Sequence, residues 1–264
     1  MYTLGFIGCG NMGGALVKAA AKAVDGKTIA IADFDQTKLA TLQKDCGAVP
    51  STAEEIAKTC KFVVLGVKPQ NMQAMLAPLA DTLKTRGDVV LITIAAGVSI
   101  AGICGYIGAE LPVIRIMPNT PALVGEGMIL YDTKGVSAKD EQAFLACFAK
   151  AGTLDKLPEE KIDAASALSG CGPAFVYAFA EALADGAVEC GLARDKANLY
   201  AAQTLRGAAE MLLTFGHPAD LKDAVCSPGG TTIAGIHALE NGRFRGVTMS
   251  AVLAAYQRTL ELKK

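Results

Sequence analysis

Short apolar runs alternate with longer segments of helical periodicity through the first half of the chain. Segments 11–22 and 35–45 repeat apolar residues at the three- and four-residue spacing of a helix that buries one face. Alternation of strand and helix predicts an α/β fold with a mostly parallel sheet covered by helices on both faces. The predicted strands are 3–7, 28–32, 62–67, 89–94 and 113–117.

The pattern changes after residue 157, where strand-like runs end and alanine becomes frequent. Gly170, Gly172 and Pro173 separate one helical segment from the next. We therefore predict two domains, a dinucleotide-binding α/β domain over 1–157 and an all-helical domain over 158–264. Alanine-rich faces let helices approach closely, and they suit either an internally packed bundle or burial against a second subunit.

Residues 89–109 carry no charge, and a run of this length could span a bilayer. Four glycines interrupt the run, and its first half is rich in β-branched residues. We therefore predict a buried strand, a tight turn and a short glycine-rich helix, with no membrane span.

Composition narrows the choice of partner and compartment. The 264 residues are 52% hydrophobic and have a net charge of −1 without blocks of like charge, which favours a small ligand over nucleic acid. Eight cysteines lie scattered without a Cys-x-x-Cys pair, and only two histidines accompany them, so we expect neither a metal site nor disulfides. The N-terminus has no basic segment before its first apolar run, and we expect a cytoplasmic protein.

Gly8, Gly10 and Gly13 have Gly-x-Gly-x-x-Gly spacing between the first strand and the first helix. The first glycine permits a tight turn, the second lets backbone amides approach a pyrophosphate, and the third lets the helix pack closely on the strand. In a chain with 28 glycines the spacing could arise by chance. The strand before it and the helix after it favour a dinucleotide-binding loop.

Asp33 ends the second predicted strand, where an acid can accept hydrogen bonds from the adenosine ribose. Its charge would repel a 2′-phosphate, and the neighbouring sequence offers Lys38 but no arginine, which favours NADH. The alternative is that Asp33 or Asp35 only caps the following helix.

Ligands of open parallel sheets bind beyond the carboxyl ends of the strands. The ends of the third and fourth predicted strands place Val67, Lys68, Pro69, Ala95, Ala96 and Gly97 there. Lys68 either contacts the cofactor or is a solvated residue at the end of a strand. Asn119, in the turn "MPNTP", either approaches the nicotinamide or only braces the turn.

Several segments together resemble one family, pyrroline-5-carboxylate reductase. They occur in the family's order and cover the chain nearly end to end. The segments are "GFIGCGNMG", "LGVKP", "RIMPNTPALVGEGM", "SGCGPAFVYAFAEALADGAVECGL" and "SPGGTTIAGIHALE".

The resemblance implies NADPH- or NADH-dependent reduction of 1-pyrroline-5-carboxylate to L-proline. It also implies a Rossmann-type, doubly wound sheet followed by an all-helical dimerisation domain, with dimers assembled into rings such as decamers. Ser227, Gly229, Gly230, Thr231 and Thr232 would bind the substrate carboxylate. With the residues discussed above, the expected cofactor contacts are Gly8, Gly10, Asn11, Met12, Gly13, Asp33, Gly66, Val67, Lys68, Pro69, Ala95, Ala96, Gly97 and Asn119.

By the same resemblance Thr232 lies beside the ring nitrogen of the substrate and is the expected catalytic residue. Its hydroxyl would stabilise the protonated imine or pass a proton through water, whereas the alternative is a threonine that only caps its helix. Gly229 and Gly230 would gather backbone amides at a helix start, which suits a carboxylate.

Two other functions compete with this interpretation. A β-hydroxyacid dehydrogenase shares the layout but uses a helical lysine as proton donor, and residues 173–190 contain no lysine. A non-catalytic dinucleotide sensor would bind the cofactor equally well but would leave "SPGGTT" without a role.

Overall fold

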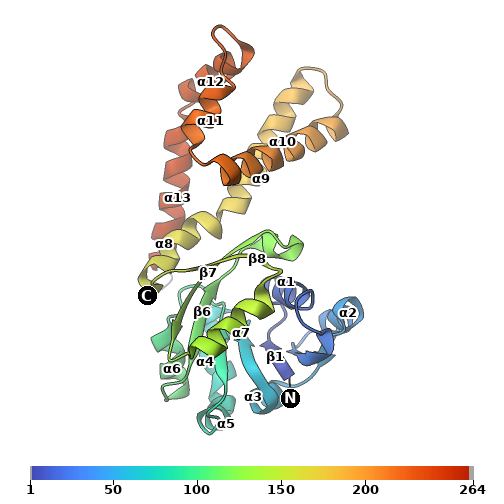
Figure 1. Ribbon diagram of the computed structural model, residues 1–264, viewed down its shortest axis with the longest axis vertical. Helices are drawn as coiled ribbons and strands as arrows, with labels where there is room; N and C mark the ends of the chain where they lie inside the picture. The colour runs from blue at the N-terminus through green and yellow to red at the C-terminus, as the bar shows by residue number, and fades with distance from the viewer. Residues whose placement is uncertain (1, 262–264) are drawn as a thin grey trace. The chain divides into compact units, whose positions relative to one another are not determined.

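The structure is a computed structural model that describes residues 2–261. Figure 1 shows the sheet with helices packed against it. The sheet has eight strands in the order β3-β2-β1-β4-β5-β6-β7-β8. The strands are β1 (Tyr2–Ile7), β2 (Ile29–Ala32), β3 (Val49–Pro50), β4 (Cys60–Leu65), β5 (Val90–Thr93), β6 (Val113–Met117), β7 (Gly127–Lys134) and β8 (Gly152–Lys156).

Every neighbouring pair of strands is parallel except β6 with β7. This order and direction confirm the predicted mostly parallel, doubly wound sheet. Three strands, β3, β7 and β8, were not predicted. β3 has only two residues, and β8, "GTLDK", is partly exposed and carries two charges, so neither forms an apolar run.

Side chains of each central strand alternate between two hydrophobic cores, one on each face of the sheet. Phe6 and Phe62 lie in one core, with helices α1 (Asn11–Ala20), α2 (Gln36–Cys46) and α7 (Ala138–Phe148). Ile7 and Val63 lie in the other. That core is covered by α3 (Ala53–Thr59), α4 (Met72–Leu76), α5 (Ala80–Lys84) and α6 (Ile100–Ile107).

The uncharged run 89–109 forms the predicted strand, turn and helix, namely β5 and α6 joined through Gly97, whose φ is +76°. Within residues 2–261 a different run, Glu159–Glu189, is long and apolar enough to cross a membrane by length and composition. Helices of soluble proteins pass the same test, so this property does not establish a span.

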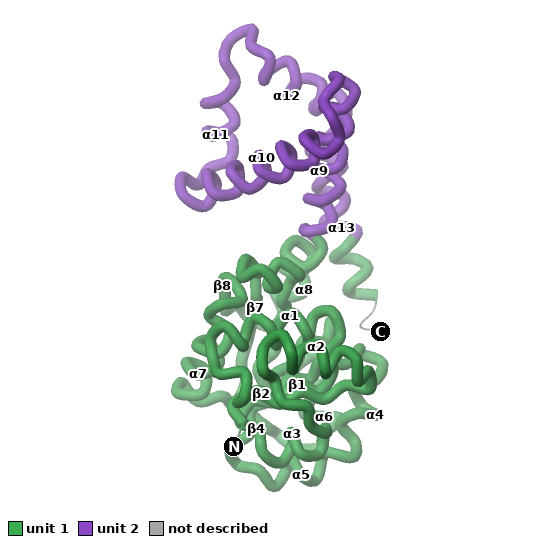
Figure 2. Tube along the Cα trace, turned by 90° about the vertical axis from the view of Figure 1, so that its right-hand side faces the viewer, with its two compact units in different colours: residues 1–171, 255–264 green, residues 172–254 purple. Residues whose placement is uncertain are grey.

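The chain divides into two compact units (Figure 2), residues 1–171 with 255–264 and residues 172–254. The expected boundary at 157/158 lies between β8 and helix α8 (Glu159–Ser169), but α8 groups with the sheet. The contacts of α8 with the sheet include a buried ion pair between Arg115 of β6 and Asp163 of α8. The other helices are α9 (Gly172–Glu189), α10 (Arg194–Phe215), α11 (Pro218–Ala224), α12 (Thr231–Asn241) and α13 (Phe244–Glu261).

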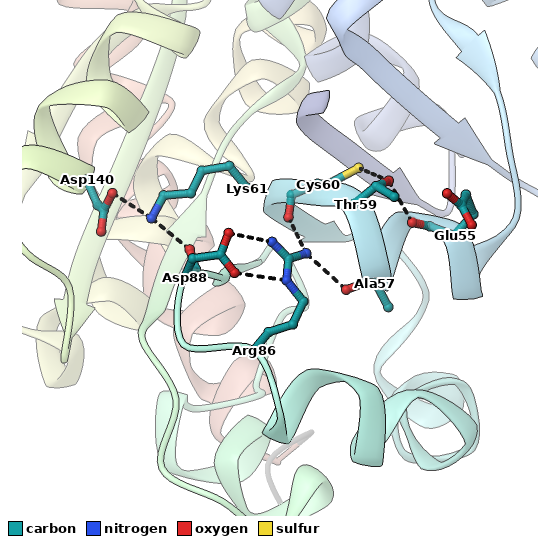
Figure 3. A network of polar contacts seen from close by, with 8 residues as sticks. All are labelled: Glu55, Ala57, Thr59, Cys60, Lys61, Arg86, Asp88 and Asp140. Carbon is teal, nitrogen blue, oxygen red and sulfur yellow. Dashed lines mark hydrogen bonds and ion pairs between the residues drawn. The ribbon is translucent and has the colours of Figure 1, made fainter. Parts of the chain in front are cut away.

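A polar network ties together the amino ends of β4 and β5 (Figure 3). The Arg86 guanidinium donates through Nε and Nη2 to both carboxylate oxygens of Asp88, and through Nη1 to the carbonyls of Ala57 and Cys60. The bond to Arg86 holds the pKa of Asp88 below its usual range. Because parallel strands share their polarity, this network lies at the edge of the sheet opposite the carboxyl ends.

Candidate active site

The glycine loop is in backbone contact with the end of β4. Gly8 has a φ of +99°, and a Cβ added to it would lie 2.7 Å from the carbonyl carbon of Gly66. A Cβ on either Gly13 or Gly66 would overlap the Gly8 carbonyl oxygen. The Gly8 turn and the close Gly13 packing therefore have the geometry of a dinucleotide loop, and Gly66 shares the same constraint.

The first turn of α1 is open to an anion. Gly10 is its N-cap, and no side chain of the described residues caps the free amides there. A Cβ on Gly10 would meet no atom within 4 Å, so the space outside this residue is clear. Asn11 is exposed beside it, and Met12 is partly buried against the core. Free amides, the helix dipole and clear space fit a pyrophosphate.

Asp33 braces the glycine loop from the end of β2. Its Oδ2 accepts the Cys9 amide at 2.6 Å, and its Oδ1 accepts the Asp35 amide at 2.9 Å. The helix-capping alternative applies to Asp35, whose Oδ1 accepts the amides of Thr37 and Lys38. Asp33 is partly exposed and each of its oxygens can accept a further bond, so its contact with the ribose stays a prediction.

Two other features lie near Asp33. The Phe34 side chain is fully exposed, and Lys38 pairs with Asp35 at 3.5 Å. Burial, followed by the nearby Asp33 charge, raises the pKa of the Cys9 thiol to about 12. This thiol therefore stays protonated at neutral pH and is a packing group inside the loop.

The ends of β4 and β5 lie beside this loop in the sheet order. Gly66, Val67 and Pro69 are partly buried, whereas Lys68 is exposed and forms no ion pair with any described residue. After β5, Ala95 is buried and Ala96 exposed, and the Ala95 amide donates to Thr93 Oγ1 at 3.3 Å. Thr93 was not predicted as a site residue, because a β-branched residue is typical of a buried strand and gives no signal of a polar contact.

Asn119 has the geometry of the bracing alternative. Its Oδ1 accepts the Met128 amide at 2.9 Å, and its Nδ2 donates to the Ser169 carbonyl at 2.9 Å. The side chain is nearly buried and thereby joins the turn after β6 to β7 and to the end of α8. A cofactor contact by Asn119 stays a prediction.

A buried ion cluster lies on the same unit and was not predicted. Arg115 is 2% exposed and donates through Nη2 to Asp163 at 2.6 Å and through Nη1 to Glu159 at 3.3 Å. Glu159 Oε1 also accepts the amide of Ile100, the first residue of α6, at 2.7 Å. The sequence signal was Arg115 itself, a single charge inside the apolar strand "VIRIM".

The loop 227–232 belongs to the second unit and ends in the start of α12. Gly229 has a φ of +67°, and the Gly230 amide donates to the Ser227 carbonyl at 3.0 Å, which closes the turn. Gly230 is the N-cap, with Thr231 and Thr232 as the first residues of the helix. The Thr232 hydroxyl is exposed and makes no hydrogen bond within residues 2–261, so it does not serve as the cap.

Comparison with known proteins gives matches over both units. A sequence profile described as "Pyrroline-5-carboxylate reductase dimerisation" matches residues 159–262, and one described as "NADP oxidoreductase coenzyme F420-dependent" matches residues 3–97. A pyrroline-5-carboxylate reductase of Pisum sativum is 39% identical over 99% of this chain and 96% of its own. One from Methanosarcina acetivorans is 40% identical over 99% of this chain and 98% of its own.

Solved structures agree with these relatives. The NADP-bound pyrroline carboxylate reductase of Plasmodium falciparum has a TM-score of 0.89 and 33% identity over 100% of this chain and 98% of its own. A pyrroline-5-carboxylate reductase of Coxiella burnetii has a TM-score of 0.89 and 31% identity, and the match covers 100% of this chain and 99% of its own.

Proposed function

Because the chain belongs to the pyrroline-5-carboxylate reductase family, we propose that it reduces 1-pyrroline-5-carboxylate to L-proline with NADPH or NADH. The observation that carries the proposal is sequence identity of about two residues in five to such enzymes over nearly the whole chain. The starts of α1 and α12 support the proposal, because neither is capped by a side chain and each could hold one anionic group of the reactants.

The reaction adds a hydride to the imine carbon and a proton to the imine nitrogen. When bound, the reduced nicotinamide supplies the hydride. The start of α1 would hold the pyrophosphate, and the start of α12 would hold the substrate carboxylate. Hydride transfer itself requires the two reacting carbons to lie about 3–3.5 Å apart. The imine nitrogen can be protonated near neutral pH, so the site needs orientation more than a strong protein acid.

Initial rates with the purified full chain test this function directly. We expect 1-pyrroline-5-carboxylate to cause oxidation of NADPH or NADH, with proline as the product. Tight dinucleotide binding without any such oxidation would instead favour a non-catalytic sensor.

Thr232→Ala is expected to lower kcat about tenfold, which corresponds to one lost hydrogen bond to a charged partner. The KM for the dinucleotide should stay within about twofold, because α1 lies in the other unit. Thr232→Ser keeps the hydroxyl and is the matched control, which should retain most of the activity. A kcat unchanged in Thr232→Ala would remove Thr232 from the mechanism.

For the choice of cofactor, we propose a preference for NADH. Asp33 and Asp35 place two carboxylates at the end of β2, and the nearby Lys38 already pairs with Asp35. Phe34 offers an exposed aromatic face at this position rather than a cation. A 2′-phosphate would thus meet negative charge without a free base.

Asp35→Asn tests this preference, since asparagine caps helices as well as aspartate does. We expect kcat/KM for NADPH relative to NADH to rise about fivefold, which is roughly 1 kcal/mol. Asp45→Asn removes the same charge near the other end of α2, where Asp45 pairs with Lys18, and it should leave the ratio unchanged. An equal change of this ratio in Asp35→Asn and Asp45→Asn would show that the charge at the end of β2 does not select between NADH and NADPH.

For the assembly, we propose a homodimer through the helical region, with larger rings such as decamers built from it. The structure describes all residues from 172 to 254. Only three of them are buried, namely Ala184, Ala197 and Ala201. Large apolar side chains such as Leu213 and Phe215 are exposed in the single chain. Surface of this kind is typical of a subunit interface, and sedimentation of the full chain would measure the mass.

The cytoplasm remains the proposed location. All eight cysteines lie within the described residues and are free thiols, which suits a reducing compartment.

A further inference from the structure

The buried cluster of Arg115, Glu159 and Asp163 has no role in the chemistry described above. It joins β6 to α8 and to the start of α6, because Arg115 pairs with Glu159 and Asp163, and Glu159 also accepts the Ile100 amide. The Glu159 amide donates to Asp132 Oδ2 at 2.8 Å, so the first residue of α8 is bound through its backbone and its side chain. The Arg115 and Asp163 side chains are only 2% and 3% exposed, whereas Glu159 is 28% exposed. Charges as buried as the first two are costly unless paired, which points to a requirement for a defined geometry.

Glu159 also contacts the first residue of α6, directly after the segment that follows β5. Within the segment, the Ala95 amide donates to Thr93 Oγ1, the Val98 amide to the Ala95 carbonyl, and the Gly102 amide to Ser99 Oγ. Glu159 binds from outside the segment, because its Oε1 accepts the amide of Ile100 at 2.7 Å. A carboxylate is also favoured at a helix start by the helix dipole.

We propose that Glu159 is a positioning residue for the dinucleotide. Through Ile100 it fixes the loop 95–97, which follows β5 at the carboxyl edge of the sheet, and Arg115 with Asp163 fixes Glu159. Part of this inference, the effect on turnover, rests on the proposed reductase function.

The test compares three variants of the full-length protein. Glu159→Ala removes the acceptor for the Ile100 amide, whereas Glu159→Gln keeps a neutral acceptor. Asp88→Ala is the matched control, since it removes an acid from another largely buried arginine, Arg86, at the opposite edge of the sheet (Figure 3). In both alanine variants the arginine keeps other partners, Asp163 for Arg115 and two backbone carbonyls for Arg86.

Three measurements are made on each variant: the Kd for NADH by fluorescence titration, hydrogen exchange of the peptide 94–104, and kcat. We expect Glu159→Ala to raise the Kd about fivefold, to speed exchange in this peptide, and to lower kcat about tenfold, because small misplacements of reacting groups slow catalysis steeply. Glu159→Gln should stay within about twofold of the parent in Kd. Asp88→Ala should lower Tm without changing the Kd for NADH, the exchange of peptide 94–104 or kcat.

Two results would overturn the proposal: an unchanged Kd and exchange rate in Glu159→Ala, or an equal loss in Glu159→Gln, which would make the charge rather than the Ile100 bond responsible. If Glu159→Ala does not fold, Glu159→Leu, which keeps volume without an acceptor, replaces it with the same outcomes. NADH binding and exchange are independent of substrate. A parent protein inactive on 1-pyrroline-5-carboxylate would refute the proposed reaction and leave this test intact.

Discussion

Gly13→Ala is expected to raise the Kd for NADH about a hundredfold and to destabilise the fold by about 1–3 kcal/mol. The added Cβ would overlap the carbonyl oxygen of Gly8, a backbone atom held between β1 and β4. The Gly8 backbone cannot retreat freely, because its own amide donates to the Ala32 carbonyl and the Ile7 carbonyl just before it accepts the Gly66 amide. Fluorescence titration and urea unfolding measure the two effects.

Gly10→Ala separates binding from stability. Its Cβ would meet nothing within 4 Å, so the free energy of unfolding should change by no more than about 1 kcal/mol. The methyl group would occupy space at the helix start where the pyrophosphate is expected, and the Kd should rise about tenfold. Gly14→Ala, one turn into the same helix, is the control and should leave the Kd unchanged. Normal NADH binding by Gly10→Ala would contradict the assignment of this loop.

Arg115→Met is expected to lower the free energy of unfolding by about 3–5 kcal/mol, the cost of breaking a buried ion pair from one side. The change removes the cation that faces Asp163, a carboxylate only 3% exposed, while methionine fills most of the volume. Urea unfolding at neutral pH measures the loss.

Arg86→Met is the comparison, and it should cost less. The partner acid, Asp88, is 52% exposed and can regain water. Adding Asp163→Leu to Arg115→Met should recover most of the lost stability, because an apolar pair can replace a buried ion pair. Equal losses in Arg115→Met and Arg86→Met, or no recovery in the double variant, would show that burial of the pair does not control the cost.

Local pattern was sufficient for much of the fold. The five apolar runs became β1, β2, β4, β5 and β6, because a strand buried on both faces needs a continuous apolar run. The strands β7 and β8 were not predicted: β8 is partly exposed and polar, and β7 gains its place by antiparallel pairing with β6.

The glycine loop was predictable from the sequence because backbone geometry leaves only glycine at such contacts. The positive φ of Gly8 and the contact of Gly13 with the Gly8 carbonyl are properties of main-chain atoms. They therefore restrict both positions to glycine, and this is visible in the sequence. Side-chain partners were not predictable in this way. Asp33 and Asn119 had two possible roles each, and a residue's hydrogen-bond partners depend on neighbours that the fold brings close.

The sequence alone therefore determined the α/β layout, the dinucleotide loop, the helical second region and the family resemblance, since each follows from residue type and local spacing. The tertiary structure alone decided that Gly230 rather than Thr232 caps α12, that Asp33 braces Cys9, and that α8 is bound to the sheet. It also brought together Arg115, Glu159 and Ile100, which are 15 to 59 positions apart in the chain. Hydrogen bonds and ion pairs act over a few ångströms of space, and only folding sets those distances.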